Sequence, residues 1–138
     1  MRFFDWRPEE SEVLGKIFRP VAKVGIRTTQ SDWKFLRTYV DSGADISVIQ
    51  RSFGELLGLD VEKGKYAVFE GAGGGKLETY IHNIEMKIVD DVFKTKVAFC
   101  KDPLSQTPNL LGRNTVFDLF EIHFKNIDKK TGFVRTVE

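Results

Sequence analysis

One carboxylate, Asp41, stands where an apolar stretch ends and a polar turn begins. Tyr39 and Val40 precede it, and Ser42 and Gly43 follow it. A carboxylate in such a place is costly to bury unless another group binds its charge or chemistry uses it. Gly43 allows backbone N–H groups to approach the carboxylate and fix its orientation. The arrangement suits an aspartate that activates water for hydrolysis, although an ordinary Asp-Ser-Gly turn has the same residues.

The composition is typical of a soluble globular protein. The chain has 138 residues, enough to bury a core, and we expect residues 1–138 to form a single domain. Apolar residues make up 41%, charged residues make up 30%, and the net charge is +1. This balance gives no sign of a surface that binds nucleic acid or a membrane.

The expected compartment follows from the cysteine count and the hydropathy pattern. Cys100 is the only cysteine, so no internal disulfide can form. No apolar run has the length of a membrane span, and charged residues interrupt the first residues too early for a secretory signal. We therefore expect a cytoplasmic protein.

Alternating apolar and polar residues predict a mainly β fold. Asp41 comes directly after one of the expected strands, so that strand positions the carboxylate. Polar and proline-containing segments predict a loop over 102–108 and a turn over 128–132. The expected strands cover residues 22–26, 33–40, 46–49, 66–69, 77–81, 84–88, 93–99 and 120–124.

Two short helices are predicted between the strands. Residues 52–55, Ser-Phe-Gly-Glu, fit a capping box that starts a helix over residues 56–57, with Gly58 as its stop. Asn114 is placed to cap a second helix. The buried face of that helix would consist of residues at helical spacing, namely Val116, Leu119 and Phe120.

Metal and phosphate chemistry find no support in the sequence. His82 and His123 lack the spacing of metal ligands to each other and to Cys100, so we expect no metal site. The glycine-rich residues 71–75 are followed by Lys76 and Leu77, without the Ser or Thr that ends a phosphate-binding loop. We expect no cofactor.

Four segments, in chain order, resemble landmarks of the retropepsin-like aspartic proteases. Arg19-Pro20-Val21-Ala22-Lys23-Val24-Gly25-Ile26 is similar to the strand before the active site of the viral enzymes. Asp41-Ser42-Gly43-Ala44-Asp45 resembles their Asp-Thr/Ser-Gly-Ala signature, and Gly71-Ala72-Gly73-Gly74-Gly75 falls where they carry a glycine-rich flap. Thr107-Pro108-Asn109-Leu110-Leu111-Gly112-Arg113-Asn114 is similar to the segment that opens their helix. The recognisable core covers about residues 16–124.

The resemblance implies a closed β-rich barrel with one short C-terminal helix, assembled as a two-fold homodimer. Each subunit would contribute one catalytic Asp41, and the two carboxyls would hold a water that attacks a peptide bond. Two carboxyls a few ångströms apart share a proton because both do not ionise easily, and aspartic proteases are the usual example. The resemblance thus implies an aspartic endopeptidase without a cofactor, whose partners are a second copy and a peptide or protein substrate.

The resemblance also implies roles for the neighbouring residues. Ser42-Gly43-Ala44 would form the active-site turn, with the Ser42 hydroxyl bonding across the dimer. Asp45 and Arg113 would form a buried ion pair behind the turn. The flap that opens and closes over a peptide would be Gly71-Ala72-Gly73-Gly74-Gly75. Gly112 and Asn114 would belong to the segment that starts the helix.

Two other functions remain open on the sequence. A non-catalytic module of the same fold could bind peptides or only dimerise, because the segments outside residues 16–124 could build a different interface or block one. A glycosidase-like pair of carboxylates within one chain would need a second acid near Asp41. Asp45 is close in sequence, but Arg113 explains it better.

Overall fold

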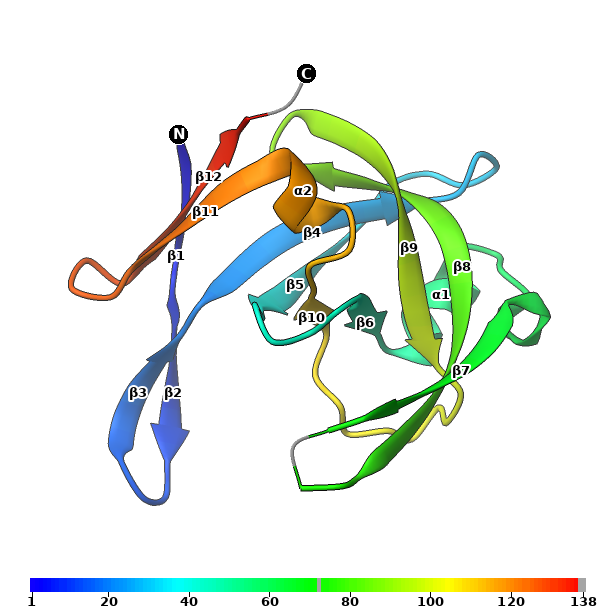
Figure 1. Ribbon diagram of the computed structural model, residues 1–138, viewed down its shortest axis with the longest axis horizontal. Helices are drawn as coiled ribbons and strands as arrows, with labels where there is room; N and C mark the ends of the chain where they lie inside the picture. Colours follow the sequence, from blue (N-terminus) through cyan, green and yellow to red (C-terminus); the bar gives the residue numbers. More distant parts are fainter. Residues whose placement is uncertain (72, 137–138) are drawn as a thin grey trace.

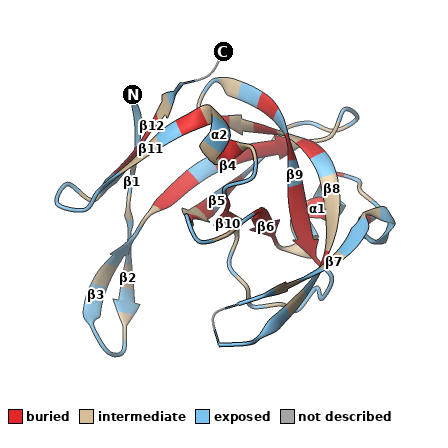
Figure 2. Cartoon of the chain, viewed as in Figure 1, coloured by how far each residue is buried: buried red, intermediate tan, exposed pale blue. Residues whose placement is uncertain are grey.

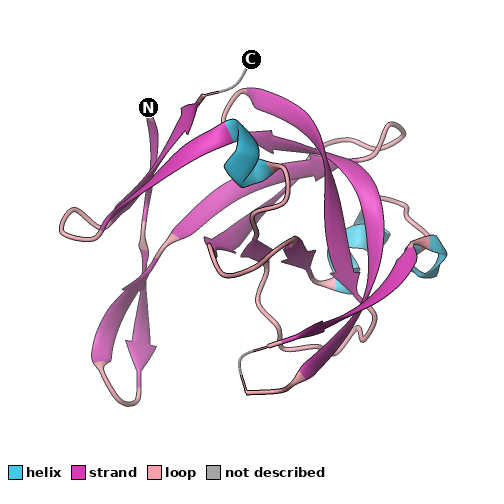
Figure 3. Ribbon diagram, in the orientation of Figure 1, coloured by secondary structure: helices cyan, strands magenta, loops and turns pink. Residues whose placement is uncertain are grey.

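The computed structural model describes residues 1–71 and 73–136, and most of the ribbon is β-strand (Figure 3). Its elements in chain order are β1 (Arg2–Asp5), β2 (Arg7–Ser11), β3 (Gly15–Arg19), β4 (Val21–Arg27), β5 (Lys34–Val40), β6 (Ser47–Ile49), α1 (Arg51–Leu56), the 3-10 helix η1 (Val61–Lys63), β7 (Lys65–Glu70), β8 (Lys76–Ile88), β9 (Asp91–Cys100), β10 (Leu110–Leu111), α2 (Val116–Leu119), β11 (Phe120–Lys125) and β12 (Lys130–Arg135).

A closed barrel forms the body of the molecule, as the resemblance implied (Figure 1). Within the described residues, its sheet runs in the order β4-β5-β10-β6-β9-β8-β7. Gly25, Ile26 and Arg27 of β4 also pair with β8, and this pairing closes six of the strands into the barrel. The strand β7 stays outside the closed ring and forms a hairpin with β8.

The barrel strands carry most of the buried residues, which are red in Figure 2. Val24 and Ile26 of β4, Met86 of β8 and Phe99 of β9 are fully buried in one cluster. Each such side chain contributes about 1.5–3 kcal/mol through its removal from water. The barrel is therefore a rigid support for the loops at its ends.

The strand β8 is longer than predicted, because two expected strands over 77–81 and 84–88 are one. Apolar residues fall at odd positions up to Ile81 and at even positions from Ile84 on, and this shift predicts a break between two strands. In the structure, Leu77 and Ile81 pack against a second apolar cluster, whereas Ile84 and Met86 face the main core. Both faces of β8 are used, so the phase changes without an interruption of the strand.

The helix α1 begins earlier than the predicted capping box. Its N-cap is Gln50, with no side-chain cap hydrogen bond, so the prediction that Ser52 starts the helix is wrong. The Gln50 N–H instead donates to Asn109 Oδ1 at 2.9 Å, which fixes the chain as it leaves β6. Gly58 ends the helix as predicted, at φ +80°, and its N–H donates to the Glu55 carbonyl at 2.9 Å.

The helix α2 also departs from its predicted cap. Thr115 is the N-cap, at φ +68° and without a side-chain cap bond, so the prediction that Asn114 caps the helix is wrong. Asn114 Oδ1 accepts the Thr115 hydroxyl at 3.2 Å. The Asn114 backbone N–H donates to the Asp45 carbonyl, so it is not available to the helix. The helix ends at Leu119, and Phe120 belongs to β11.

Residues at the two ends of the chain form a second sheet, in the order β1-β12-β11. Its pairings set Phe3 opposite Gly132 and Phe4 opposite Thr131, and Trp6 Nε1 donates to Thr131 Oγ1 at 2.7 Å. The predicted turn over 128–132 is displaced, because the turn covers 126–129 and Gly132 lies within β12. No strand was predicted over residues 2–19, where the structure has three.

The hairpin of β2 and β3 projects from the barrel on the same side as the terminal sheet (Figure 1). Most of its residues are exposed, including Val13 and Leu14 at its tip (Figure 2). Among the described residues, no helix is long and apolar enough to cross a membrane.

Candidate active site

Asp41 follows β5 directly, and hydrogen bonds from the backbone of Val40 and Asp41 to two other segments hold it in place. The Asp41 N–H donates to the Leu111 carbonyl at 3.0 Å, and the Val40 N–H donates to the Pro20 carbonyl at 2.9 Å. The Asp41 carboxylate accepts the Gly43 N–H at Oδ1, at 2.9 Å. This bond orients the carboxylate as the Asp-Ser-Gly sequence predicted. Asp41 is half-buried, whereas Ser42 and Gly43 are exposed.

The segment after β10 holds the active-site turn from behind. The Arg113 N–H donates to the Ala44 carbonyl at 2.8 Å, and the Asn114 N–H donates to the Asp45 carbonyl at 2.9 Å. The Gly112 N–H donates to the buried Ser47 hydroxyl at 3.0 Å. Two segments far apart in the sequence are thus joined through their backbones, so the glycine and asparagine act by backbone contacts rather than as a helix cap.

The predicted ion pair between Asp45 and Arg113 is present, with Arg113 Nη2 at 2.5 Å from Asp45 Oδ1. The expectation that it is buried is wrong, because the Asp45 side chain is 78% exposed and the Arg113 side chain 54% exposed. The pair is joined through Arg113 Nη2 and Asp45 Oδ1 and lies at the surface of the single chain, where water screens it. The backbone bonds fix the turn more strongly than this pair does.

The predicted glycine-rich segment lies at the end of the β7–β8 hairpin. Glu70 pairs with Lys76, and the Gly71 N–H donates to the Gly75 carbonyl at 2.9 Å, so the chain reverses within residues 71–75. Gly73 and Gly74 have φ of +101° and +83°, values that favour glycine. Ala72, which was predicted with them, lies outside the described residues.

A cleft of about 620 Å³ separates the active-site turn from the β7–β8 hairpin. Asp41, Gly43, Ala44 and Asp45 line it on one side, and Gly71 and Gly75 line it on the other. The apolar walls are formed by Ile46, Val48, Phe69, Leu77 and Leu110. Other predicted residues do not line the cleft, namely Ser42, Gly73, Gly74, Gly112, Arg113 and Asn114.

Comparison with known proteins agrees with this geometry. Residues 18–119 match the model of the retroviral aspartyl protease family. The chain belongs to that family. Among solved structures it is similar to EIAV protease complexed with the inhibitor HBY-793, at 25% sequence identity and a TM-score of 0.55. The likeness covers 73% of this chain and 88% of the other. No curated protein sequence matches the chain.

This retroviral-type protease chain has a second cavity at Asp41, of about 360 Å³. Asp41 and Leu110 line both cavities, so the two cavities are neighbours. Glu9 of the β2–β3 hairpin also lines the second cavity, and its Oε2 accepts the Tyr39 hydroxyl at 2.5 Å. That hydrogen bond, aided by burial, raises the pKa of Tyr39 above its ordinary value. Sequence reasoning missed Glu9, since nothing local relates residue 9 to residue 39.

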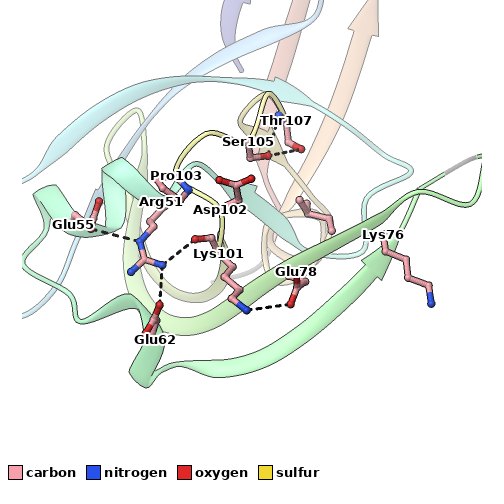
Figure 4. Close-up of a pocket in the computed structure, with 11 residues that line it drawn as sticks. Arg51, Glu55, Glu62, Lys76, Glu78, Lys101, Asp102, Pro103, Ser105 and Thr107 are labelled. Carbon is pink, nitrogen blue, oxygen red and sulfur yellow. Dashed lines mark hydrogen bonds and ion pairs between the residues drawn. The ribbon is translucent and has the colours of Figure 1, made fainter.

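A larger hollow, of about 760 Å³, lies next to the cleft and shares Lys76, Leu77 and Thr107 with it. Its charged side chains mainly bind one another (Figure 4). Arg51 donates to the Lys101 carbonyl at 3.0 Å and lies 3.5 Å from Glu62, while Lys101 Nζ lies 3.4 Å from Glu78. The 620 Å³ cleft is the candidate active site, because it contains Asp41 and has apolar walls.

The histidines and acids of the described residues are not arranged as metal ligands. Among residues 1–71 and 73–136, no group of three His, Cys, Asp or Glu side chains is placed to hold a metal ion. His82 Nε2 lies 2.7 Å from the Val61 carbonyl, and His123 Nε2 lies 2.6 Å from Glu121. His82 therefore has a hydrogen-bond partner away from the cleft, whereas the buried His123 Nε2 lies close to the Glu121 carboxylate without a hydrogen bond.

Proposed function

We propose that this chain is an aspartic endopeptidase that acts as a two-fold dimer, with one Asp41 from each copy. The observation that carries the proposal is the position of Asp41 in the cleft below the β7–β8 hairpin, with its carboxylate oriented by Gly43. The neighbouring acids of the same chain have other partners, since Asp45 binds Arg113 and Glu9 binds Tyr39. Asp45 and Glu9 are thus less suited to complete the carboxylate pair than the Asp41 of a second copy.

The surface around the turn supports this assembly. Ser42 and Gly43 are exposed in the single chain, although they flank the carboxylate. On the same side of the barrel, the terminal sheet has unpaired outer edges at β1 and β11 (Figure 1). Phe3 and Phe124 on these strands are 47% and 43% exposed. Free strand edges and exposed aromatic side chains favour pairing with another chain.

The proposed reaction needs no covalent intermediate. The paired carboxyls share one proton, because two negative charges so close repel each other. The ionised carboxyl takes a proton from the bound water, and the water oxygen attacks the scissile carbonyl carbon. The protonated carboxyl donates to the carbonyl oxygen. Collapse of the tetrahedral intermediate breaks the C–N bond, and the amine leaves with a proton from the pair.

The cleft favours an extended peptide as the substrate. Such a peptide can bind as an added strand between the β7–β8 hairpin and the turn, with its main chain hydrogen-bonded on both sides. Apolar cleft residues such as Val48, Phe69 and Leu77 would receive its side chains. In this proposal the β7–β8 hairpin is the flap, and its glycines permit it to open for substrate and close afterwards.

The test compares purified wild-type chain with Asp41→Asn in digestion of a random peptide library. We expect the variant to lose at least about a hundredfold in rate, because both the base and the acid are lost. Asp32→Asn is the matched control, since Asp32 is an exposed aspartate in another turn. Hydrolysis by Asp41→Asn at the parent's rate would refute the proposal. So would sedimentation that finds only monomer under conditions where the chain is active.

A further inference from the structure

The second cavity that Asp41 lines has features of a substrate subsite. Its volume of about 360 Å³ lies within the range of small-ligand pockets. Its walls are partly apolar and partly charged. The apolar part consists of Pro20, Val40, Pro108 and Leu110, and the polar part consists of Glu9, Arg19, Tyr39 and Asp41. Any group bound there would lie beside the carboxylate that the proposed function makes catalytic.

Glu9 brings a carboxylate to this cavity from outside the residues that match the family, 18–119. The register of the β2–β3 hairpin, with Glu9 opposite Ile17, sets its place on the strand. Its side chain is 26% exposed. Glu10, the next residue of the strand, is exposed and does not line the cavity. The strand therefore turns one of two adjacent glutamates toward Asp41.

One oxygen of Glu9 has room for a further donor. Oε2 accepts the Tyr39 hydroxyl at 2.5 Å. Oε1 lies 3.8 Å from Arg19 Nε, which is too far for a hydrogen bond. Arg19 is 53% exposed and can turn into solvent at little cost, because an exposed ion pair is weak. An apolar group that covered Oε1 would remove water from a carboxylate without replacing its hydrogen bonds, which is unfavourable.

We propose that this cavity binds a lysine or arginine side chain of the substrate, next to the scissile bond, through Glu9 Oε1. The inference rests on the proposed endopeptidase function. The methylene stem of the basic side chain would lie along the apolar wall, and its cationic end would donate to Glu9. With Asp41 ionised, the cavity holds two carboxylates and one guanidinium, so a cation balances its charge. Specificity for a basic residue would thus come from the hairpin rather than from the barrel.

The test maps the cleavage sites in a random peptide library by mass spectrometry for wild type, Glu9→Gln and Glu10→Gln. For wild type we expect Lys and Arg to be enriched about tenfold at one position that flanks the cleaved bond. Glu9→Gln should lose this enrichment, and Glu10→Gln should keep it. In matched peptides, Glu9→Gln should lower kcat/KM for a lysine peptide about tenfold more than for its norleucine analogue.

Several results would overturn the subsite. The first is cleavage by wild type without enrichment of Lys or Arg, and the second is an enrichment that Glu9→Gln retains. The third is an equal loss of kcat/KM for the lysine and norleucine peptides in Glu9→Gln, because such a loss indicates only a structural role for Glu9. If wild type shows no cleavage that depends on Asp41, the proposed function fails and binding decides the subsite. Fluorescence anisotropy would then compare the labelled lysine and norleucine peptides. A lysine preference that Glu9→Gln removes supports the cavity, and equal binding refutes it.

Discussion

Replacement of Gly112 by alanine tests how the active-site turn is held. Gly112 lies against the backbone directly after that turn. A Cβ at this position would be 2.3 Å from the backbone carbonyl atoms of Ile46 and 2.8 Å from the nitrogen of Ser47. Atoms in favourable contact are about 3.5–4.0 Å apart. The added methyl group must therefore push the backbone at Ile46, because no flexible side chain stands in its way.

The expected cost has two parts. An extra methyl group in a well-packed region costs about 1–3 kcal/mol. The Gly112 N–H also donates to the buried Ser47 hydroxyl at 3.0 Å, and loss of a buried partner costs about 1–3 kcal/mol. We expect Gly112→Ala to lower the free energy of unfolding by about 2–6 kcal/mol, a large part of the usual total of about 5–15 kcal/mol. Ile46 lines the cleft, so hydrolysis by the folded fraction should fall too.

Urea unfolding followed by tryptophan fluorescence measures this loss. A decrease of that size moves the midpoint by about 1–2 M at an unchanged slope. Gly75→Ala is the control, because a Cβ at Gly75 meets no atom within 4 Å. It should change the free energy of unfolding by less than about 0.5 kcal/mol. If Gly112→Ala unfolds at the same urea concentration as wild type, the close backbone contact does not hold the turn in the way described.

Three further predictions concern single side chains. Asp45→Asn should cost less than about 1 kcal/mol in urea unfolding, and salt should reduce the difference, because its pair with Arg113 is exposed; a loss above 2 kcal/mol, well outside the range of about 0–1 kcal/mol for surface pairs, would contradict this. Cys100 is fully buried and burial raises its pKa, so a thiol reagent should modify it only after unfolding; rapid labelling of the native chain would count against that. The pKa of Tyr39 is raised by its bond to Glu9, so the stability it adds is present below about pH 10 and is lost as the pH rises through the raised pKa. The free energy of unfolding of wild type should then fall more between neutral and alkaline pH than that of Tyr39→Phe. Urea unfolding at both pH values measures this, and equal losses in the two proteins would exclude the bond.

Much of the barrel could be predicted, because apolar and polar residues alternate over much of its strands. β4 and β9 show a clear alternation of apolar and polar residues, and both lie where the sequence places them. The link between the Asp41 turn and the segment at Gly112 came from the family resemblance. Alternation alone does not indicate which loops meet, since that depends on the closure of the barrel.

The remaining features depend on contacts between distant residues. The capping rules failed at both helices because tertiary hydrogen bonds fix their first residues, as the bond between Gln50 and Asn109 shows. The pairing of β1 with β12 joins residues at opposite ends of the chain. Residues 1–19 show no regular alternation of apolar and polar residues from which these strands could be predicted. The Glu9–Tyr39 bond is of the same kind.

In the terminal sheet, β1 pairs with β12 of the same chain, and the outer edges of β1 and β11 stay open. The barrel also closes within one chain. One chain thus forms its own barrel, whereas the proposed pair of carboxylates needs two chains. Below the concentration at which dimers form, the copies would be inactive, and hydrolysis would rise with the square of the chain concentration until dimers dominate. Under this proposal, activity would therefore depend on the concentration that the chain reaches and not only on its folding.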